Sequence, residues 1–102
     1  MIAVITRVKS ASVTIGGETR AYIGRGFLVL LGVVPGDGES EAEYLAGKVT
    51  GLRVFEDEVG KMNLSLDDVK GAMIVVSNFT LAADCSHGRR PSFTGAAGPE
   101  VA

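Results

Sequence analysis

The sequence predicts a single α/β domain that is mostly β, with a barrel-like mixed sheet and one clear helix. The chain has 102 residues, a length typical of one domain. Segments rich in Val, Ile and Thr recur along it and are separated by glycines, as expected for short strands joined by turns. Only one segment, about Glu41–Thr50, carries apolar residues at helical spacing.

The N-terminal third predicts strands joined by glycine turns. Ile2–Ile15 is rich in Val, Ile and Thr, and its alternation is sharpest over Ala11–Ile15. Gly16-Gly17 suits the positive φ angles of a tight hairpin turn, so Glu18–Ile23 is expected as the return strand. Phe27–Val34 is a continuous apolar run, which favours a strand buried on both faces.

The helix has start and stop signals of its own. Ser40 and Glu43 have the spacing of a capping box. Gly51 stands where a glycine ends many helices in a left-handed conformation. The expected apolar face consists of Ala42, Leu45, Ala46 and Val49.

The C-terminal half is less regular. Leu52–Phe55 is expected as a short strand, followed by an acidic turn over Glu56–Gly60. A second strong apolar strand contains Met73–Val76, and Ala82–Gly98 is expected to be a long loop. Gly98–Ala102 has the pattern of a helix start, with proline at a favoured first position.

Composition excludes several classes of protein. Hydrophobic residues make up 46% and charged residues 22%, which excludes disorder. A net charge of −2 argues against binding nucleic acid by bulk electrostatics. Cys85 is the single cysteine and His87 the single histidine, so neither an internal disulfide nor an ordinary zinc site is expected. With no apolar run near 20 residues, we expect a soluble cytosolic protein.

Three short motifs have structural interpretations. Gly24–Gly26 lacks the third glycine of a dinucleotide fingerprint and is expected to be a turn. Cys85 and His87 lie in a loop where a nucleophile and its base seldom meet, so surface positions are expected. Glu56–Glu58 has no calcium-loop spacing and is expected to be a solvated acidic turn.

Two features leave a functional alternative open. The first is the pair Arg89-Arg90. These arginines are either ordinary surface residues or part of a phosphate-binding patch that also includes Lys61, Arg7 or Arg25. The segment Ser77-Asn78-Phe79-Thr80 directly follows the apolar strand. It is either a simple strand end or a site in which released backbone N–H groups line an oxyanion hole.

The order and spacing of several motifs resemble one family over the whole chain. The matching stretches are AVITRV at 3–8, IGRG at 23–26, LRVF at 52–55, GKMNL at 60–64, VVSNFTL at 75–81 and GRRPSF at 88–93. Together they resemble the bacterial D-aminoacyl-tRNA deacylases, also called D-tyrosyl-tRNA deacylases.

The resemblance implies a cytoplasmic homodimer that needs no cofactor or metal. Its reaction is hydrolysis of the ester of D-aminoacyl-tRNA, and of glycyl-tRNA mischarged on tRNA-Ala, in translational proofreading. The implied catalytic segment is Ser77, Asn78, Phe79 and Thr80, with backbone N–H groups near Phe79 and Thr80 facing the substrate. The implied substrate-binding residues are Arg7, Met62, Lys61, Arg89 and Arg90.

Two departures from the family pattern are visible. Asn78 stands where the family usually has glutamine, a side chain one methylene longer. Residues 1–102 are expected to be one deacylase domain that lacks the family's C-terminal third, including its Asn-x-Gly-Pro-x-Thr motif. The alternatives are a tRNA-end binding module without turnover and a non-functional fragment.

Overall fold

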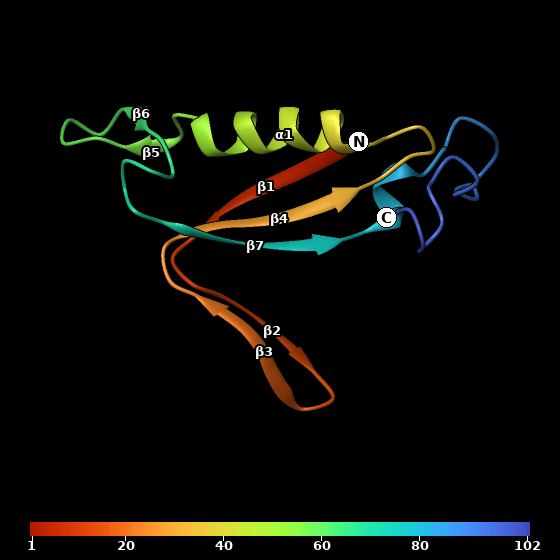
Figure 1. Ribbon diagram of the computed structural model, residues 1–102, viewed down its shortest axis with the longest axis horizontal. Helices are drawn as coiled ribbons and strands as arrows, with labels where there is room; N and C mark the ends of the chain where they lie inside the picture. The colour runs from red at the N-terminus through yellow and green to blue at the C-terminus, as the bar shows by residue number, and fades with distance from the viewer.

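The computed structural model describes residues 1–102 and consists of short strands, one α-helix and one 3₁₀ helix (Figure 1). In chain order the elements are β1 Ile2–Val8, β2 Ala11–Ile15, β3 Glu18–Ile23, β4 Gly26–Gly32, α1 Glu39–Gly51, β5 Phe55–Glu56, β6 Met62–Leu64, β7 Ala72–Ser77 and η1 Phe79–Ala82. The expected α/β class, mostly strand with one helix, is confirmed.

The central element is β4, which pairs on both sides. It runs antiparallel to β1 and parallel to β7, giving the strand order β1-β4-β7 and confirming a mixed sheet. Ile5, Val29 and Val75 lie side by side across the three strands. The parallel pair needs a long crossover, and α1 with the β5–β6 hairpin supplies it.

The sheets do not close into a barrel, which corrects the barrel-like expectation. The strands form one three-stranded sheet and two separate two-stranded sheets, β2-β3 and β5-β6. Closure requires the edge strands to pair with each other, whereas β1 and β7 each pair only with β4. The β2–β3 hairpin projects away from the main sheet (Figure 1).

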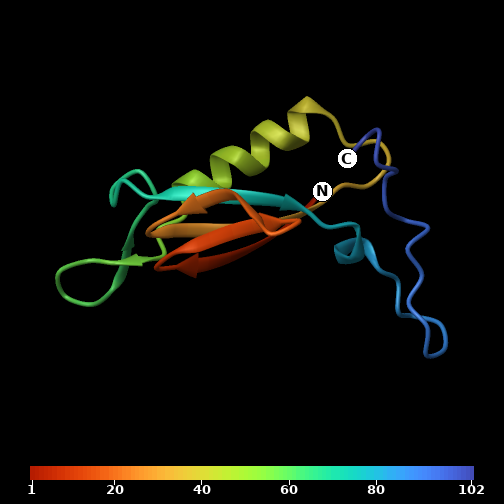
Figure 2. The same cartoon turned by 90° about the horizontal axis from the view of Figure 1, so that it is seen from below.

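The core lies between α1 and one face of the main sheet. Its buried members are Phe27, Val29, Val49, Phe55 and Leu66. The rings of Phe27 and Phe55 stack with centroids 5.1 Å apart. Because α1 covers a single face, Leu28 and Leu30 on the other face are only half-buried. The expectation that Phe27–Val34 is buried on both faces is therefore wrong for the second face (Figure 2).

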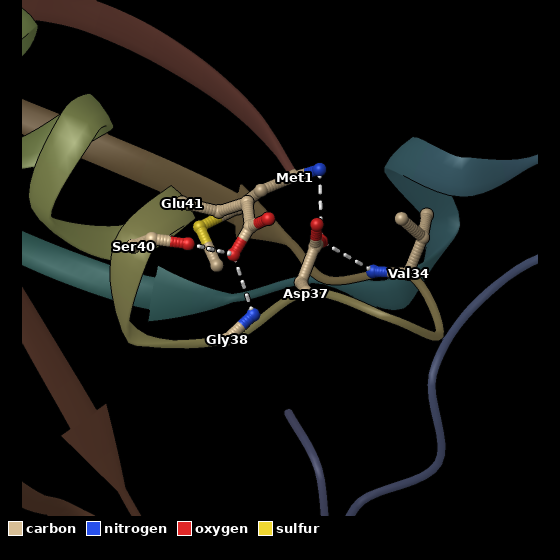
Figure 3. A network of polar contacts seen from close by, with 6 residues as sticks. All are labelled: Met1, Val34, Asp37, Gly38, Ser40 and Glu41. Carbon is tan, nitrogen blue, oxygen red and sulfur yellow. Dashed lines mark hydrogen bonds and ion pairs between the residues drawn. The ribbon is translucent and has the colours of Figure 1, made fainter.

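The helix exists where expected, but its ends differ. It begins at Glu39, and the Glu41 carboxylate accepts a hydrogen bond from the N–H of Gly38 at 2.8 Å, so the predicted Ser40–Glu43 cap is wrong. Ser40 instead donates its hydroxyl to Glu41 (Figure 3). Gly51 is the last helical residue and not a left-handed terminator, because the chain leaves the helix in extended conformation at Leu52.

Asp37 holds the turn between β4 and α1 (Figure 3). Its carboxylate lies 2.8 Å from the α-ammonium group of Met1 and accepts the N–H of Val34 at 3.0 Å. The hydrogen bond from the Met1 ammonium group lowers the pKa of Asp37, and the Val34 N–H lowers it further. The turn therefore ties the start of β1 to the end of β4.

Only the end of the predicted strand Leu52–Phe55 is correct. Pairing is confined to Phe55 with Leu64 and Glu56 with Met62. The carbonyl of Val54 accepts a hydrogen bond from the Arg7 guanidinium group at 2.6 Å, so a side chain takes the place of a strand partner. The acidic turn expected over Glu56–Gly60 is confirmed for residues 57–60, whereas Glu56 belongs to β5.

The predicted glycine turn and the strand containing Met73–Val76 are confirmed, whereas the helix start predicted at Gly98–Ala102 is not, because residues 99–101 form a turn and no helix. Gly16 and Gly17 adopt φ angles of 58° and 82° in the turn between β2 and β3. The predicted loop Ala82–Gly98 begins one residue later, because Ala82 is the last residue of η1, and residues 83–98 are irregular apart from the isolated bridge between Asp84 and Ser92. The helix of the protein is too short to cross a membrane.

Gly26 allows β4 and β7 to approach closely. A Cβ atom at this position would overlap the backbone carbonyl of Ala72, which belongs to the neighbouring strand and cannot rotate away. The glycine is therefore required by the parallel pairing, in addition to ending the turn that the sequence predicted.

We expect Gly26→Ala to destabilise the fold by about 3 kcal/mol or more, because the added methyl group forces β4 and β7 apart. Gly47→Ala is the matched control, since a Cβ at this helical position meets nothing within 4 Å. It should stabilise the fold by about 0.8–1.0 kcal/mol. Urea unfolding midpoints measure both changes, and similar midpoints for the two variants would contradict the assignment.

Candidate active site at the end of β7

The segment Ser77-Asn78-Phe79-Thr80 forms a sharp turn where β7 leaves the sheet. The N–H of Asn78 donates to the carbonyl of Leu31 in β4 at 2.8 Å, which is the last bond of the parallel ladder. The chain then enters the 3₁₀ helix η1 at Phe79. This bond anchors the turn to the most buried strand, so its backbone has a fixed place.

The Asn78 side chain caps this 3₁₀ helix. Its Oδ1 atom accepts the N–H of Thr80 at 3.1 Å and also the Thr80 hydroxyl. The short asparagine side chain reaches a donor two residues ahead, as asparagine does in local turns. Consequently both polar groups of Thr80 that could face a substrate are engaged by Asn78.

A cavity of about 200 Å³ lies beside this turn. Its lining residues are Ser77, Phe79, Ala97, Pro99 and Ala102. The ring of Phe79 meets that of Phe93 edge-on, with centroids 5.4 Å apart and the planes at 78°. Ala97 is buried, and its N–H donates to the carbonyl of Val33 at 2.8 Å, which ties the C-terminal loop to the end of β4.

Arg89 and Arg90 lie in the loop at this same end of the molecule (Figure 2). Asp84 and Ser92 close the base of that loop through two backbone hydrogen bonds, of 2.6 and 2.8 Å. The Asp84 carboxylate accepts the hydroxyl and the N–H of Ser86, and these bonds lower the pKa of Asp84. Both arginines are exposed.

Arg7, Lys61 and Met62 lie at the opposite end of the sheet (Figure 1). Lys61 and Met62 belong to the β5–β6 hairpin, where the N–H of Lys61 donates to the Asp57 carboxylate at 3.0 Å. This contact and the N–H of Val59 lower the pKa of Asp57. Met62 is 63% exposed.

The structure thus divides the predicted site residues into two groups. The end of β7 and the loop that carries Arg89 and Arg90 lie at one end of the molecule, whereas the end of β1 and the β5–β6 hairpin, which carry Arg7, Lys61 and Met62, lie at the other (Figure 1). The hairpin that carries Lys61 and the loop that carries Arg89 and Arg90 are at opposite ends of the molecule, so the expected single patch of these residues is not formed within one chain (Figure 1).

Comparison with known proteins supports the family resemblance that the sequence motifs indicate. The model of the family described as D-Tyr-tRNA(Tyr) deacylase matches residues 4–102. The chain belongs to this family. A D-aminoacyl-tRNA deacylase of Desulfatibacillum aliphaticivorans is 62% identical over 102 residues, which cover all of this chain and 70% of the relative. One of Geotalea uraniireducens is 58% identical, over all of this chain and 66% of the relative.

A solved structure has the same fold as this chain. The protein titled c-Myc DNA Unwinding Element Binding Protein superposes with a TM-score of 0.88 at 44% sequence identity, covering 96% of this chain and 66% of that one. The chain spans about two thirds of the length of these relatives. The names of the family and of its members describe hydrolases that act on D-aminoacyl-tRNA.

Sequence reasoning did not single out several residues that support this candidate site through packing and backbone contacts. Phe93 packs against Phe79, and Asp84 and Ser92 close the arginine loop. No local spacing predicts these contacts, since each depends on how the loop folds back. Cys85 and His87 are exposed, as expected of surface positions. No group of three His, Cys, Asp or Glu side chains is placed to hold a metal ion.

We expect Asn78→Ala to free the N–H of Thr80, because the alanine side chain offers no acceptor. Loss of such a cap costs about 1 kcal/mol, so amide hydrogen exchange at Thr80 should become roughly fivefold faster. Asn78→Asp keeps the acceptor and should retain protection. Unchanged exchange at Thr80 in the alanine variant would contradict the cap.

Proposed function

We propose that this chain hydrolyses the ester that joins a D-amino acid to the 3′ end of tRNA. The observation that carries the proposal is the turn at Ser77–Thr80, where backbone N–H groups lie at the end of β7 beside a cavity. The proposed substrates are D-aminoacyl-tRNA and glycyl-tRNA mischarged on tRNA-Ala, and the proposed location is the cytoplasm. No cofactor is proposed.

The turn can support ester hydrolysis through its backbone. Water adds to the ester carbonyl, and the oxyanion that forms is stabilised by N–H donors at Phe79 and Thr80. The tetrahedral intermediate then collapses, releasing the amino acid while the ribose oxygen of tRNA takes up a proton. The Asn78 amide has to release the N–H of Thr80 when the oxyanion forms, so Asn78 is proposed to control this donor.

The Thr80 hydroxyl is poorly placed to act as a nucleophile. It donates its hydrogen bond to the Asn78 amide oxygen, which is not a base able to remove the proton. The proposed role of Thr80 is therefore that of its backbone N–H. The proposed binding residues for the tRNA are Arg89 and Arg90 at this end, and Arg7, Lys61 and Met62 at the other.

A homodimer is proposed because the two groups of binding residues lie apart in one chain. One face of the main sheet has no helix over it, and alternation places Ile2 and Val4 there. These side chains are 40% and 43% exposed. A second copy packed on this face would bury them.

Incubation of the purified chain with D-Tyr-tRNA tests the proposal. Free D-tyrosine should appear faster than in buffer alone, and L-Tyr-tRNA run in parallel reports the stereochemical preference. No release above buffer would contradict the proposed activity.

One observation favours a second candidate, a tRNA-end binding module without turnover. The N–H of Thr80 is already hydrogen-bonded within the chain, so the oxyanion donor is engaged before substrate arrives. Retained tRNA binding with no ester hydrolysis would support this candidate over the first.

Substitutions of Thr80 separate a backbone role from a side-chain role. We expect Thr80→Ala and Thr80→Ser to keep most activity, because both retain the backbone N–H. Thr80→Pro removes that donor and should cost about 10²–10³ in rate. Circular dichroism checks that each variant folds. An inactive Thr80→Ala beside an active Thr80→Ser would identify the hydroxyl as the nucleophile.

Self-association is tested by sedimentation velocity at micromolar concentration. We expect a dimer, and Val4→Lys should shift the population toward monomer by placing a charge on the uncovered sheet face. Ile15→Lys is the matched control, since Ile15 is 60% exposed near the tip of the β2–β3 hairpin. A clean monomer of the unsubstituted chain would contradict the proposed assembly.

A further inference from the structure

A cleft at the end of β1 and the start of β4 brings three cations together. Its volume is about 390 Å³, and it is lined by Arg7, Val8, Lys9, Arg25, Phe55 and Glu56. Glu56 is the one carboxylate among these residues. The cleft lies at the Val8–Gly26 end of the sheet, whereas the candidate active site follows the Leu31–Ser77 end.

The three cations are not neutralised by the chain itself. Its ion pairs are Met1 with Asp37 and Arg20 with Glu18, and neither involves a residue of the cleft. Lys9 is exposed directly after β1, and Arg25 is exposed directly before β4. A protein of net charge −2 therefore presents a local concentration of positive charge here.

Arg25 is held by a rigid support. Its guanidinium carbon lies 5.1 Å from the centroid of the Phe55 ring, and that ring is buried and stacked on Phe27. The carbonyl of Arg25 accepts the N–H of Ala72 at 3.1 Å, which fixes the backbone beside the close approach at Gly26. A cation restrained in this way loses little conformational freedom when an anion binds.

Arg7 is restrained as well. It pairs with Phe27 in the sheet, and one guanidinium nitrogen, Nη1, donates to the carbonyl of Val54 at 2.6 Å. A guanidinium group has five N–H donors, so others stay available for an anion. Two restrained arginines beside a lysine suit phosphate oxygens, which arginine binds in a bidentate manner.

We propose that this cleft binds a backbone phosphate of RNA, making a second contact to tRNA away from the ester. The inference rests on the proposed function, which supplies tRNA as the ligand. The cleft is open at the surface, so a continuing strand can pass through it. Along β7, six residues at about 3.3 Å each separate the two ends by roughly 20 Å. The contact would position the nucleic acid without reading its sequence.

Binding of fluorescently labelled, uncharged tRNA to the purified chain tests the proposal. Lys9→Gln and Arg25→Gln should each weaken binding roughly threefold to tenfold at low salt and lower the salt slope by about one unit. Arg20→Gln is the matched control, because it removes the same charge from the β2–β3 hairpin, where Arg20 already pairs with Glu18 at 3.2 Å. It should bind like the unsubstituted chain.

The outcomes distinguish a lost phosphate contact from a lost fold. Arg25→Gln also loses its contact with Phe55, so thermal unfolding is measured for each variant, while Lys9→Gln removes no such contact. Unchanged affinity and salt slope in Lys9→Gln, or no tRNA binding by the unsubstituted chain, would overturn the proposal. If the substitutions weaken binding of inorganic phosphate and leave tRNA binding unchanged, the RNA assignment is wrong.

The tRNA-binding experiment tests the phosphate site separately from the proposed hydrolysis. Uncharged tRNA carries no ester, so a chain that binds tRNA through the cleft and fails to release D-tyrosine would contradict only the proposed activity. A chain that hydrolyses D-Tyr-tRNA with cleft variants that bind tRNA normally would contradict only the phosphate site.

Discussion

The close approach of β4 to β7 at Gly26 is the contact on which both ends of this molecule depend. With no side chain at Gly26, the backbone of Ala72 can pair in parallel with β4. That pairing carries Ser77 to Leu31, where the N–H of Asn78 completes the ladder and the candidate active-site turn begins. A wider spacing would displace the start and the end of β7 together.

The two ends of the sheet have different chemistry. The turn after β7 offers backbone N–H groups, a capping amide and a small cavity, which suit the stabilisation of a developing oxyanion. The cleft before β4 offers restrained cations, which suit a phosphate. A protein with a net negative charge can therefore bind a polyanion at a local cluster of cations. At moderate salt, acidic residues more than about 10 Å away are largely screened from that site.

Asn78 connects local stability with the proposed chemistry. Its amide satisfies the N–H of Thr80 in the free protein, which stabilises η1 and occupies a donor proposed for catalysis. The short side chain reaches Thr80 because the two residues are only two apart in a turn. The Thr80 hydroxyl is drawn to the same acceptor, so the turn presents its backbone rather than a free nucleophile.

The sequence by itself determined the features that depend on neighbouring residues. The Gly16-Gly17 turn, the longer strands and the existence of α1 follow from local backbone preference and periodicity, whereas the short strands β5 and β6 do not. The resemblance also located the segment Ser77–Thr80. The cap of α1 was mispredicted because the helix begins at Glu39, two residues earlier than the Ser40–Glu43 spacing suggested, so Glu41 and not Glu43 reaches back to the N–H of Gly38.

The tertiary structure alone decided which distant residues meet. The carbonyl of Val54 accepts a hydrogen bond from the side chain of Arg7, 47 positions earlier in the chain, and not from a neighbouring strand. Arg25 gained its aromatic support from Phe55 across the core, and the sheets stayed open because β1 and β7 both pair with β4. Such contacts depend on sheet register and on the face that α1 covers. These are set by packing between segments far apart in sequence, so no local pattern encodes them.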